Sequence, residues 1–538
     1  MRHSAGMEDL DPTPVEFRSW GWRTFAMTWI GMVINPASLA EGAALLSIGL
    51  TMGEAAVAHL LGGMILVVVL ALNAWPGVKY GIPFPVLARS SFGYVGSQFA
   101  TLTRGAVAIM WLSFQLWQGA LGLFAAGGRV FGEGFTEWGR IDEYLTLGQL
   151  LLLLAFISLH VLAVRLGAAR FRSLVYAIAP MQLLGCIAIA VWAASLCSFG
   201  DAMRADDHVA AEARTSGGAL PRPQAWLAAI NSSVGTWSTL VLNVADLSRF
   251  APSQRDQIVG QAIGLPLPFG LTGLLGLWVA GASSFAFGEA LWQIPQYFER
   301  WPPAAALAGA VVLACSILVV NVIANLLSPM NDLLNVAPHA LRHHFKTCGY
   351  ACLVLALAAC PWRIFSSQQR FVLSFLNGYS LITGAIAGVL LTDFWLIRGA
   401  RLDVAELYRA PPRQLQLSCG RCCRDTPTAN WRAFVAVGAG VAPCVPGFVA
   451  SLRGGSISIE IEQLPRALAL VYSASWFVSL GVSSATFWLL SAVIAAPPDG
   501  RKRRLCCEQQ HGEDSRLVQP TADGMQPTSS TAACEVES

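Results

Sequence analysis

The chain has 538 residues, of which 55% are hydrophobic and only 12% are charged, and its mean hydropathy is +0.54. A soluble globular protein carries about twice that fraction of charged residues, so the composition excludes an ordinary soluble domain and indicates a polytopic membrane protein in contact with the lipid bilayer. The formal net charge of +3 gives no indication of a nucleic-acid partner.

Twelve stretches predict membrane-spanning helices, because a helix needs about 20 apolar residues to cross a bilayer and satisfies its own backbone hydrogen bonds there. Apart from Glu41 in the first, these stretches contain no Asp, Glu, Lys or Arg. They lie at 24–48, 55–78, 105–128, 145–164, 173–200, 225–245, 259–288, 303–331, 347–362, 371–392, 433–452 and 467–498.

The segments outside the spans predict the orientation of the chain. An even number of spans puts both termini on one side, and most of the Lys and Arg residues fall in the tails and loops of that side, which identifies it as the cytoplasm. We expect a cytoplasmic N-tail at 1–22, a cytoplasmic loop at 399–431 and a disordered cytoplasmic C-tail at 499–538. The plasma membrane is the expected location, with an organellar inner membrane as the alternative.

The first span is interrupted by polar and helix-breaking residues. Pro36 lacks an N–H and clashes with the preceding turn, so it bends or breaks the helix, and carbonyls freed there need protein or a wet cavity as neighbours. Glu41 would cost roughly 2.5–3.5 kcal/mol in lipid and is normally retained only where it faces a polar interior. The alternatives are a simple proline kink and a solvated Glu41 at the outer mouth.

Polar residues recur in later spans. Trp111, Gln115 and Gln118 form one stripe of the third span, Trp237 follows a run of small and polar residues in the sixth, and Asn321 and Asn325 share a face of the eighth. Interruptions five spans apart, in spans one and six, predict an inverted-repeat secondary transporter with its site at the bilayer midplane. Isolated amides and indoles could instead link helices or fill a core, but two indoles with several amides suit a flat heterocycle.

Six stretches resemble the nucleobase:cation symporter-1 family of purine, pyrimidine, allantoin and hydantoin permeases, and the likeness is closer to the uracil/allantoin branch. The stretches cover nearly the whole hydrophobic body in order. They are Lys79–Gly93 (KYGIPFPVLARSSFG), Trp111–Gly119 (WLSFQLWQG), Asn243–Phe250 (NVADLSRF), Asn321–Pro329 (NVIANLLSP), Phe375–Ser380 (FLNGYS) and Ala387–Arg398 (AGVLLTDFWLIR).

The resemblance implies an all-α membrane fold of the LeuT type, with two inverted five-helix repeats and two peripheral helices. On this chain the repeats would occupy 23–200 and 225–398, and the peripheral helices 432–498. It also implies a secondary active transporter, not an enzyme, that imports a planar nucleobase or a related heterocycle or ureide and works as a monomer or weak oligomer.

The resemblance also implies roles for individual residues. Trp111 and Trp237 would stack on the two faces of the substrate, and Gln115 and Asn325 would hydrogen-bond its ring. Asn35 would add a polar contact from the first span. Two further positions depart from the hydantoin transporter of the family and would alter substrate preference; they are Thr236, which replaces a glycine, and Gln118, which replaces an apolar residue.

Residues of the first and eighth spans indicate which ion would drive transport. No cofactor other than this coupling ion is expected. In sodium-coupled relatives, carbonyls at the positions of Gly31 and Ile34 and oxygens of the eighth span, near Ser316, hold the ion. The two hydroxyl positions of that site are Val319 and Val320 here, so a sodium site is not expected. Glu41 is the only carboxylate inside a predicted span, and we expect it to couple transport to protons. Facilitated diffusion without an ion remains an alternative.

Three other functions compete with this interpretation. A transporter of the same fold could carry an amino acid or another small zwitterion, and a transporter-like protein could act as a sensor without moving its ligand. An integral membrane enzyme would need clustered His, Asp or Cys at the membrane face, whereas the eight histidines are scattered. The CxxC of Cys419 and Cys422 has no His or second CxxC beside it, so it predicts no metal site.

Overall fold

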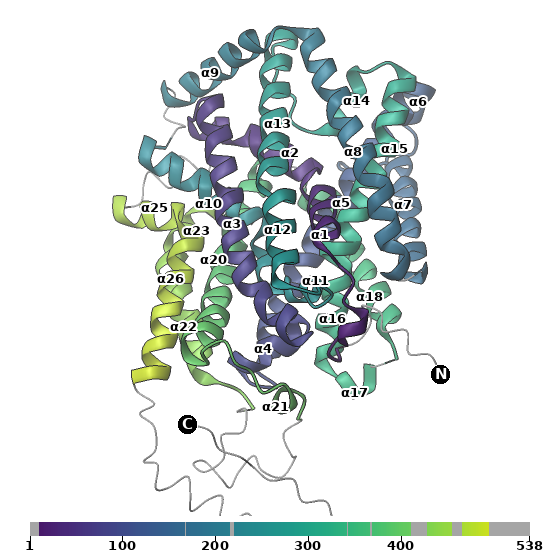
Figure 1. Ribbon diagram of the computed structural model, residues 1–538. Coiled ribbons are helices and arrows are strands. Elements are labelled where there is room, and N and C mark those ends of the chain that lie inside the picture. The colour runs from purple at the N-terminus through teal and green to yellow at the C-terminus, as the bar shows by residue number, and fades with distance from the viewer. Residues whose placement is uncertain are drawn as a thin grey trace, which may run out of the picture.

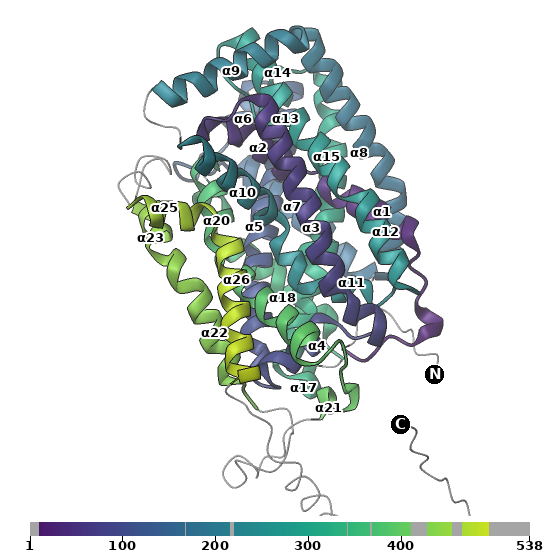
Figure 2. The same cartoon turned by 60° about the vertical axis from the view of Figure 1, so that its left-hand side comes forward.

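The computed structural model describes residues 10–166, 168–215, 220–341, 343–365, 368–409, 428–453 and 465–493. Within these ranges the chain is helical, and its only β-type pairing is a single bridge between Arg140 and Thr146. The helices pack side by side into one bundle (Figures 1 and 2). The expected disordered tail at 499–538 and the CxxC of Cys419 and Cys422 lie outside the described residues.

The two ends of the bundle carry short helices (Figure 1). One end, called here the α9 end, bears α6 (Glu133–Thr136), α9 (Phe199–Thr215) and α14 (Ile294–Arg300). The other, the α4 end, bears α4 (Phe84–Phe92), α17 (Pro338–Leu341) and α21 (Val404–Tyr408). The described chain begins at the α4 end, and its last helix also finishes there, so an even number of crossings fits the bundle (Figures 1 and 2).

Among the described residues, nine helices are long and apolar enough to cross a membrane, and a bent pair of helices near the N-terminus makes a tenth. These ten correspond to ten of the predicted spans and confirm an all-helical membrane fold. The bounds of the helices are α1 Trp22–Val33, α2 Pro36–Ala44, α3 Met52–Tyr80, α5 Ser97–Phe131, α7 Leu147–Leu166, α8 Ala168–Leu196, α12 Gln254–Gly264, α13 Pro266–Phe287, α15 Pro303–Val320, α16 Leu327–Val336, α20 Gln368–Leu391, α22 Trp431–Val441, α23 Val445–Arg453, α25 Arg466–Ser473 and α26 Ser475–Trp488.

The length and composition of the described helices do not establish the predicted number of twelve spans. The predicted spans at 225–245 and 347–362 correspond to α10 (Arg222–Asn243) and α18 (Phe345–Ala358). Helix α10 is long enough but carries a polar run in its middle, and α18 is apolar but has only 14 residues. The predicted repeat boundaries at 23–200 and 225–398, and the peripheral pair at 432–498, stay predictions.

The first span is broken, as the sequence predicts. Helix α1 ends at Val33, α2 begins at Pro36, and the two segments of the span meet at 59°. Asn35 has extended backbone angles and caps α2, because its Oδ1 accepts from the N–H groups of Ala37 at 2.8 Å and Ser38 at 3.2 Å. A proline at the first helical position lacks only a donor that would be unsatisfied there anyway. The sequence Asn-Pro therefore starts a new helix.

Close packing fixes α2 against α13. A Cβ atom added to Gly42 would lie 2.3 Å from the carbonyl oxygen of Gly273, and one added to Gly276 would lie 2.1 Å from that of Leu39. These glycines let the two backbones approach closely, as small residues do between membrane helices. The contact holds Glu41, which precedes Gly42, deep in the bundle.

The prediction that the sixth span is interrupted is wrong, because α10 runs without a break from Arg222 to Asn243. Its hydroxyl side chains bond back to carbonyls one turn earlier: Ser233 to Ala229 at 2.9 Å, and Ser238 to Gly235 at 2.8 Å. Such bonds satisfy a polar side chain within a helix without breaking it. A run of small polar residues is therefore no sign of a break unless proline or a competing cap accompanies it.

The eighth span contains an irregularity that the sequence does not predict. Between α15 and α16 the helix widens into a π-helical segment, η3 (Asn321–Leu326). Such segments occur mostly as single wide turns within helices, and they are frequent at functional sites. The segment contains Asn325, one of the predicted substrate contacts. A second π-helical segment, η4 (Thr392–Ile397), ends the tenth span.

Candidate functional site

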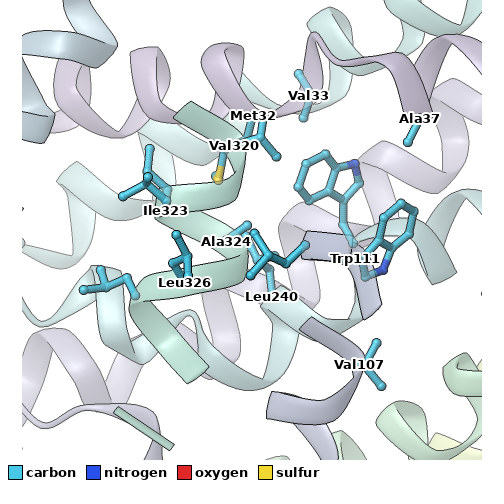
Figure 3. Packing of buried hydrophobic residues seen from close by; sticks show 14 of the residues in the cluster. Met32, Val33, Ala37, Val107, Trp111, Leu240, Val320, Ile323, Ala324 and Leu326 are labelled. Atoms are coloured by element: carbon cyan, nitrogen blue, oxygen red, sulfur yellow. The ribbon is translucent and has the colours of Figure 1, made fainter. Parts of the chain in front are cut away.

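A cavity of about 20 Å³, close to the room that one water molecule needs, lies where α2, α5, α10 and the α15–η3 stretch meet. Figure 3 shows Trp111, Leu240, Val320 and Ala324, which belong to the lining, among the buried hydrophobic side chains that pack in this region. The lining is Asn35, Ala37, Trp111, Gln115, Thr236, Trp237, Thr239, Leu240, Val320, Ala324 and Asn325. Six of the seven predicted substrate contacts are therefore brought together, and Gln118 is buried on α5 outside this lining.

The two indoles are held by other aromatic rings. Trp237 meets Trp29 edge-on, with ring centroids 5.9 Å apart at 75°, and Phe269 at 6.5 Å and 81°. The Nε1 of Trp111 donates to the hydroxyl of Tyr379 at 3.3 Å, and that hydroxyl donates to the carbonyl of Gly235 at 2.7 Å. Edge-to-face contacts favour fixed ring orientations. Both flat surfaces are thus set before any ligand arrives.

The amides in the lining differ in how they are held. The Nδ2 of Asn325 donates to Asn321 at 3.0 Å, and Asn321 in turn donates to the Nε2 of His160 at 3.1 Å. The Nδ1 of His160 then donates to the carbonyl of Phe156 at 2.9 Å. This chain of bonds orients Asn325 and occupies both nitrogens of His160, which supports a structural role for that histidine.

Two buried polar atoms of the lining have no hydrogen-bond partner among the described residues. They are Oε1 of Gln115, an acceptor, and Nε1 of Trp237, a donor. A buried polar atom without a partner costs free energy, and its presence calls for a physical reason. A ligand that offers both a donor and an acceptor would remove this cost at both atoms.

The polar atoms of Asn35 and Thr236 are engaged within the protein. Besides capping α2, Asn35 donates to the carbonyl of Met32 at 2.6 Å and to Ser38 at 3.1 Å, so its amide is fully used. The hydroxyl of Thr236 donates to Oε2 of Glu41 at 2.6 Å. Both residues form part of the wall, where Asn35 shapes the break and Thr236 connects the cavity to a carboxylate.

Glu41 is fully buried, which excludes the alternative of a solvated residue at the mouth. Four elements surround it. Helix α10 contributes Thr236, α13 contributes the glycines described above, and α20 brings Tyr379 within electrostatic reach. Helix α3 contributes His59, which hydrogen-bonds Ser233 on α10 at 3.0 Å and packs on Gly273. The carboxyl group therefore adjoins the cavity, with one hydroxyl between them.

The residues of the predicted cation position also meet. Ser316 donates its Oγ proton to the carbonyl of Ile34 at 3.0 Å, and the carbonyl of Gly31 lies nearby. A side chain that the sequence analysis does not single out lies among them: the Nε2 of Gln182 on α8 donates to all three oxygens. Val319 and Val320 are buried and contribute no side-chain oxygen.

The family profile described as "Permease for cytosine/purines, uracil, thiamine, allantoin" matches residues 12–479. The chain belongs to this permease family. It is 28% identical over 515 residues to the "Purine-uracil permease NCS1" of Arabidopsis thaliana, covering 94% of this chain and 80% of the relative. It is 29% identical over 497 residues to the "Allantoin permease" of Bacillus subtilis (strain 168), covering 90% and 93%.

Solved structures show the same fold. The permease superposes on Mhp1, a nucleobase-cation-symport-1 family transporter in a closed conformation with bromovinylhydantoin bound, with a TM-score of 0.64 and 20% identity over 92% of this chain and 98% of that one. An inward-facing structure of Mhp1 gives the same TM-score at 19% identity, over 92% and 96%. These findings confirm the family, the LeuT-type fold and a membrane transport protein in place of an enzyme.

Two residues of the permease site, Tyr379 and Gln182, are not predicted from the sequence. Tyr379 lies within a stretch already quoted for the family, and its hydroxyl connects Trp111 with α10. Gln182 is an amide in the predicted span at 173–200. One polar side chain in an apolar helix is a signal for a partner elsewhere, but nothing in the sequence says where the partner lies.

Proposed function

We propose that this permease imports a planar nucleobase-class heterocycle or ureide by alternating access, coupled to protons through Glu41. Uracil, purines, allantoin and hydantoins are the candidate substrates. The observation that carries the proposal is the cavity lined by Trp111, Trp237, Gln115 and Asn325, in which an acceptor and a donor have no partner among the described residues.

The chemistry of the lining supports this substrate class. A flat ring with alternating N–H and C=O groups presents two apolar faces and a polar edge. Indoles supply flat apolar surfaces, and an amide offers a donor and an acceptor side by side. The lining holds no charged side chain, so nothing in it would neutralise the ammonium or carboxylate of an amino acid. A zwitterionic substrate is therefore the weaker candidate.

The contracted cavity supports alternating access. At about 20 Å³ it is too small for a heterocycle, although its lining is already assembled. Binding would require α2, α5, α10 and the α15–η3 stretch to separate. The break at Asn35 provides the joint for such a movement, because a few residues at element ends absorb the backbone change in a hinge.

The position of Glu41 supports proton coupling. A buried carboxylate is costly when charged and takes up a proton in its place. Its Oε2 accepts a hydrogen bond from Thr236 in the cavity wall. Protonation would therefore alter a contact next to the substrate, as coupling requires. We also propose that the α4 end faces the cytoplasm of a cell whose plasma membrane holds the permease.

The test is uptake of labelled uracil, adenine, guanine, cytosine, allantoin and hydantoin, at acidic and neutral pH, with and without sodium. We expect concentrative uptake of at least one compound that rises at acidic pH and persists without sodium. Competition by amino acids but not by heterocycles would contradict the substrate class. Binding without accumulation in sealed vesicles would indicate a sensor.

The stacking role predicts the effect of Trp111→Ala. Base–aromatic stacking contributes about 1–3 kcal/mol per base, so substrate affinity should fall about 5- to 150-fold. Equilibrium binding to purified protein measures this. Trp117→Ala is the matched control, because Trp117 is buried on the same helix but does not line the cavity. Unchanged affinity in Trp111→Ala would remove the stacking role.

A further inference from the structure

Three oxygen atoms converge on one side-chain nitrogen where the first and eighth spans meet. The Nε2 of Gln182 lies 2.9 Å from the carbonyl oxygen of Gly31, 3.0 Å from that of Ile34 and 2.6 Å from Oγ of Ser316. The carbonyl of Gly31 belongs to the last turn of α1, and that of Ile34 belongs to the residue that caps this helix. Both lack helical partners because the helix ends at Val33. Gln182 is 2% exposed.

The partners determine which end of the amide faces this cluster. Backbone carbonyls only accept hydrogen bonds, so the end that faces Gly31 and Ile34 must be the NH₂ group. Ser316 gives its own proton to Ile34 and therefore accepts from Gln182. Two amide protons are thus shared among three acceptors, while Oε1 of Gln182 has no partner among the described residues. The position is richer in acceptors than one amide needs.

Such a cluster is what a cation requires. The C-terminal end of a broken half-helix carries partial negative charge, and unwound carbonyls with half-helix ends are where membrane transporters coordinate sodium ions or protons. Here the amide nitrogen of the chain itself lies at the point on which the oxygens converge. Hard cations need several oxygen ligands, and the neighbouring Val319 and Val320 add no side-chain oxygen.

We propose that the amide of Gln182 permanently occupies the position of a coupling cation, so that the permease binds and transports its substrate without sodium. The amide connects α8 to the end of α1 and to α15 and holds their junction closed. A sodium ion could enter only by displacing this amide. It would then lack two ligands, because Val319 and Val320 stand where sodium-coupled relatives have hydroxyl groups.

The surroundings agree with this assignment. The junction opens onto a hollow of about 410 Å³ between α2, α8, α14 and α15. None of the residues that line the hollow is Asp, Glu, Lys, Arg or His. No carboxylate of that lining would therefore balance the charge of a bound ion, whereas a neutral amide needs no such balance.

The inference deepens the proposed function, because it assigns the coupling ion by exclusion, but its test does not depend on substrate identity. The thermal midpoint of the purified permease is measured without substrate, at alkaline pH, in sodium chloride and in N-methyl-D-glucamine chloride of equal ionic strength. A ligand that binds only the folded state raises the midpoint in proportion to its saturation. We expect no sodium-specific rise for the natural sequence.

Two substitutions sharpen the test. Gln182→Glu replaces the donor by a carboxylate beside three acceptors, so it should lower the midpoint in N-methyl-D-glucamine and produce a saturable, sodium-specific rise. Gln182→Met keeps the length without the donor and should be destabilised equally in both salts. Gln261→Glu is the matched control, because Gln261 is a buried glutamine on α12 whose Nε2 donates to a side chain, that of Gln257, and to no carbonyl among the described residues. It should show no sodium-specific rise.

A saturable sodium-specific rise in the natural sequence would overturn the inference, whether or not either variant folds. A Gln182→Met protein as stable as the natural one in both salts would also overturn the inference. The amide would then make no contribution to the junction of α8 with α1 and α15. If the sodium response is absent as expected but no heterocycle binds, the proposed substrate class fails and this inference stands.

Discussion

At the scale of single residues, Glu41 links the packing of two helices to the cavity wall. It is buried beside glycines that allow α2 to touch α13, and its partner Thr236 belongs to the cavity wall. The neighbouring titratable side chains are His59 and Tyr379, and the hydroxyls of α10 lie between them. No fixed positive charge is described beside the carboxyl group, which fits the proposal that this group takes up a proton.

Glu41→Gln tests this role. The amide keeps the size of the side chain and its hydrogen bond to Thr236 but cannot release a proton. We expect exchange of labelled for unlabelled substrate to persist, while accumulation driven by an acidic outer medium falls about tenfold or more, as for the loss of a coupling of a few kcal/mol. Glu54→Gln is the control, because Glu54 pairs with Arg222 away from the cavity. Full pH-dependent accumulation in Glu41→Gln would contradict the assignment.

At the scale of elements, α9 is held on α13 by an unusual contact. Asp206 is fully buried, and neither of its carboxylate oxygens has a hydrogen-bond partner among the described residues. A Cβ atom on Gly281 of α13 would lie 2.9 Å from its Cγ, so the two helices touch at this point. Burial, together with the charge of Asp207, raises the pKa of Asp206 to about 8.

This contact predicts that α9 binds α13 more weakly as the pH rises. Docked Asp206 retains its proton up to pH of about 8, whereas free Asp206 loses it near its usual value of 3.8. The docked state binds more protons between these values, so its stability falls as pH rises through that window and is constant above it. Hydrogen exchange of α9 amides, corrected for intrinsic rates, measures this.

Asp206→Asn should slow exchange in α9 at alkaline pH and leave it unchanged at acidic pH, because the amide never ionises. Asp201→Asn is the control on the same helix. The pKa of Asp201 is lowered by hydrogen bonds from Ser198 and Arg204, so its charged form is already favoured. Equal exchange rates for the natural sequence and Asp206→Asn at alkaline pH would show that the carboxylate is not strained by docking.

The sequence predicts a structural feature where the residues that cause it act within one helical turn. The break in the first span follows from Asn35 and Pro36 alone, since a cap and a missing N–H act within one turn. The π-helical segment η3, in contrast, has partners distant in sequence. The carbonyl of Ala324 in η3, for example, accepts from Arg104 at 2.6 Å across 220 residues. No local pattern contains that information.

At the scale of the whole molecule, the same distinction holds for the site. Trp111, Trp237, Gln115 and Asn325 were predictable because their types and the family motifs carry the chemistry. Gln182 was not, because its importance comes from three oxygens on two other helices. Residues that contact the substrate are recognisable by type, whereas residues that hold two halves of a transporter together are recognisable only from their contacts.

Arg104 and Asp332 form another such connection, between α5 in the predicted first repeat and α16 in the second. Both are buried, Nη1 of Arg104 lies 3.8 Å from Oδ2 of Asp332, and neither oxygen of Asp332 has a hydrogen-bond partner among the described residues. Arg104 also holds the carbonyl of Ala324, which lines the cavity. The charged pair therefore connects the cavity wall to the packing of both repeats.

Removing one partner of a buried pair leaves an uncompensated charge and costs about 3–5 kcal/mol, whereas replacing both by apolar residues is often close to neutral. We therefore expect Arg104→Met and Asp332→Leu each to lower the thermal midpoint strongly, and the double substitution to lower it by less than their sum. The exposed pair of Arg300 and Glu289 is the control, where coupling should be at most about 1 kcal/mol. Additive losses at Arg104 and Asp332 would mean that the two repeats are held together by apolar packing and by Gln182, not by this charged pair.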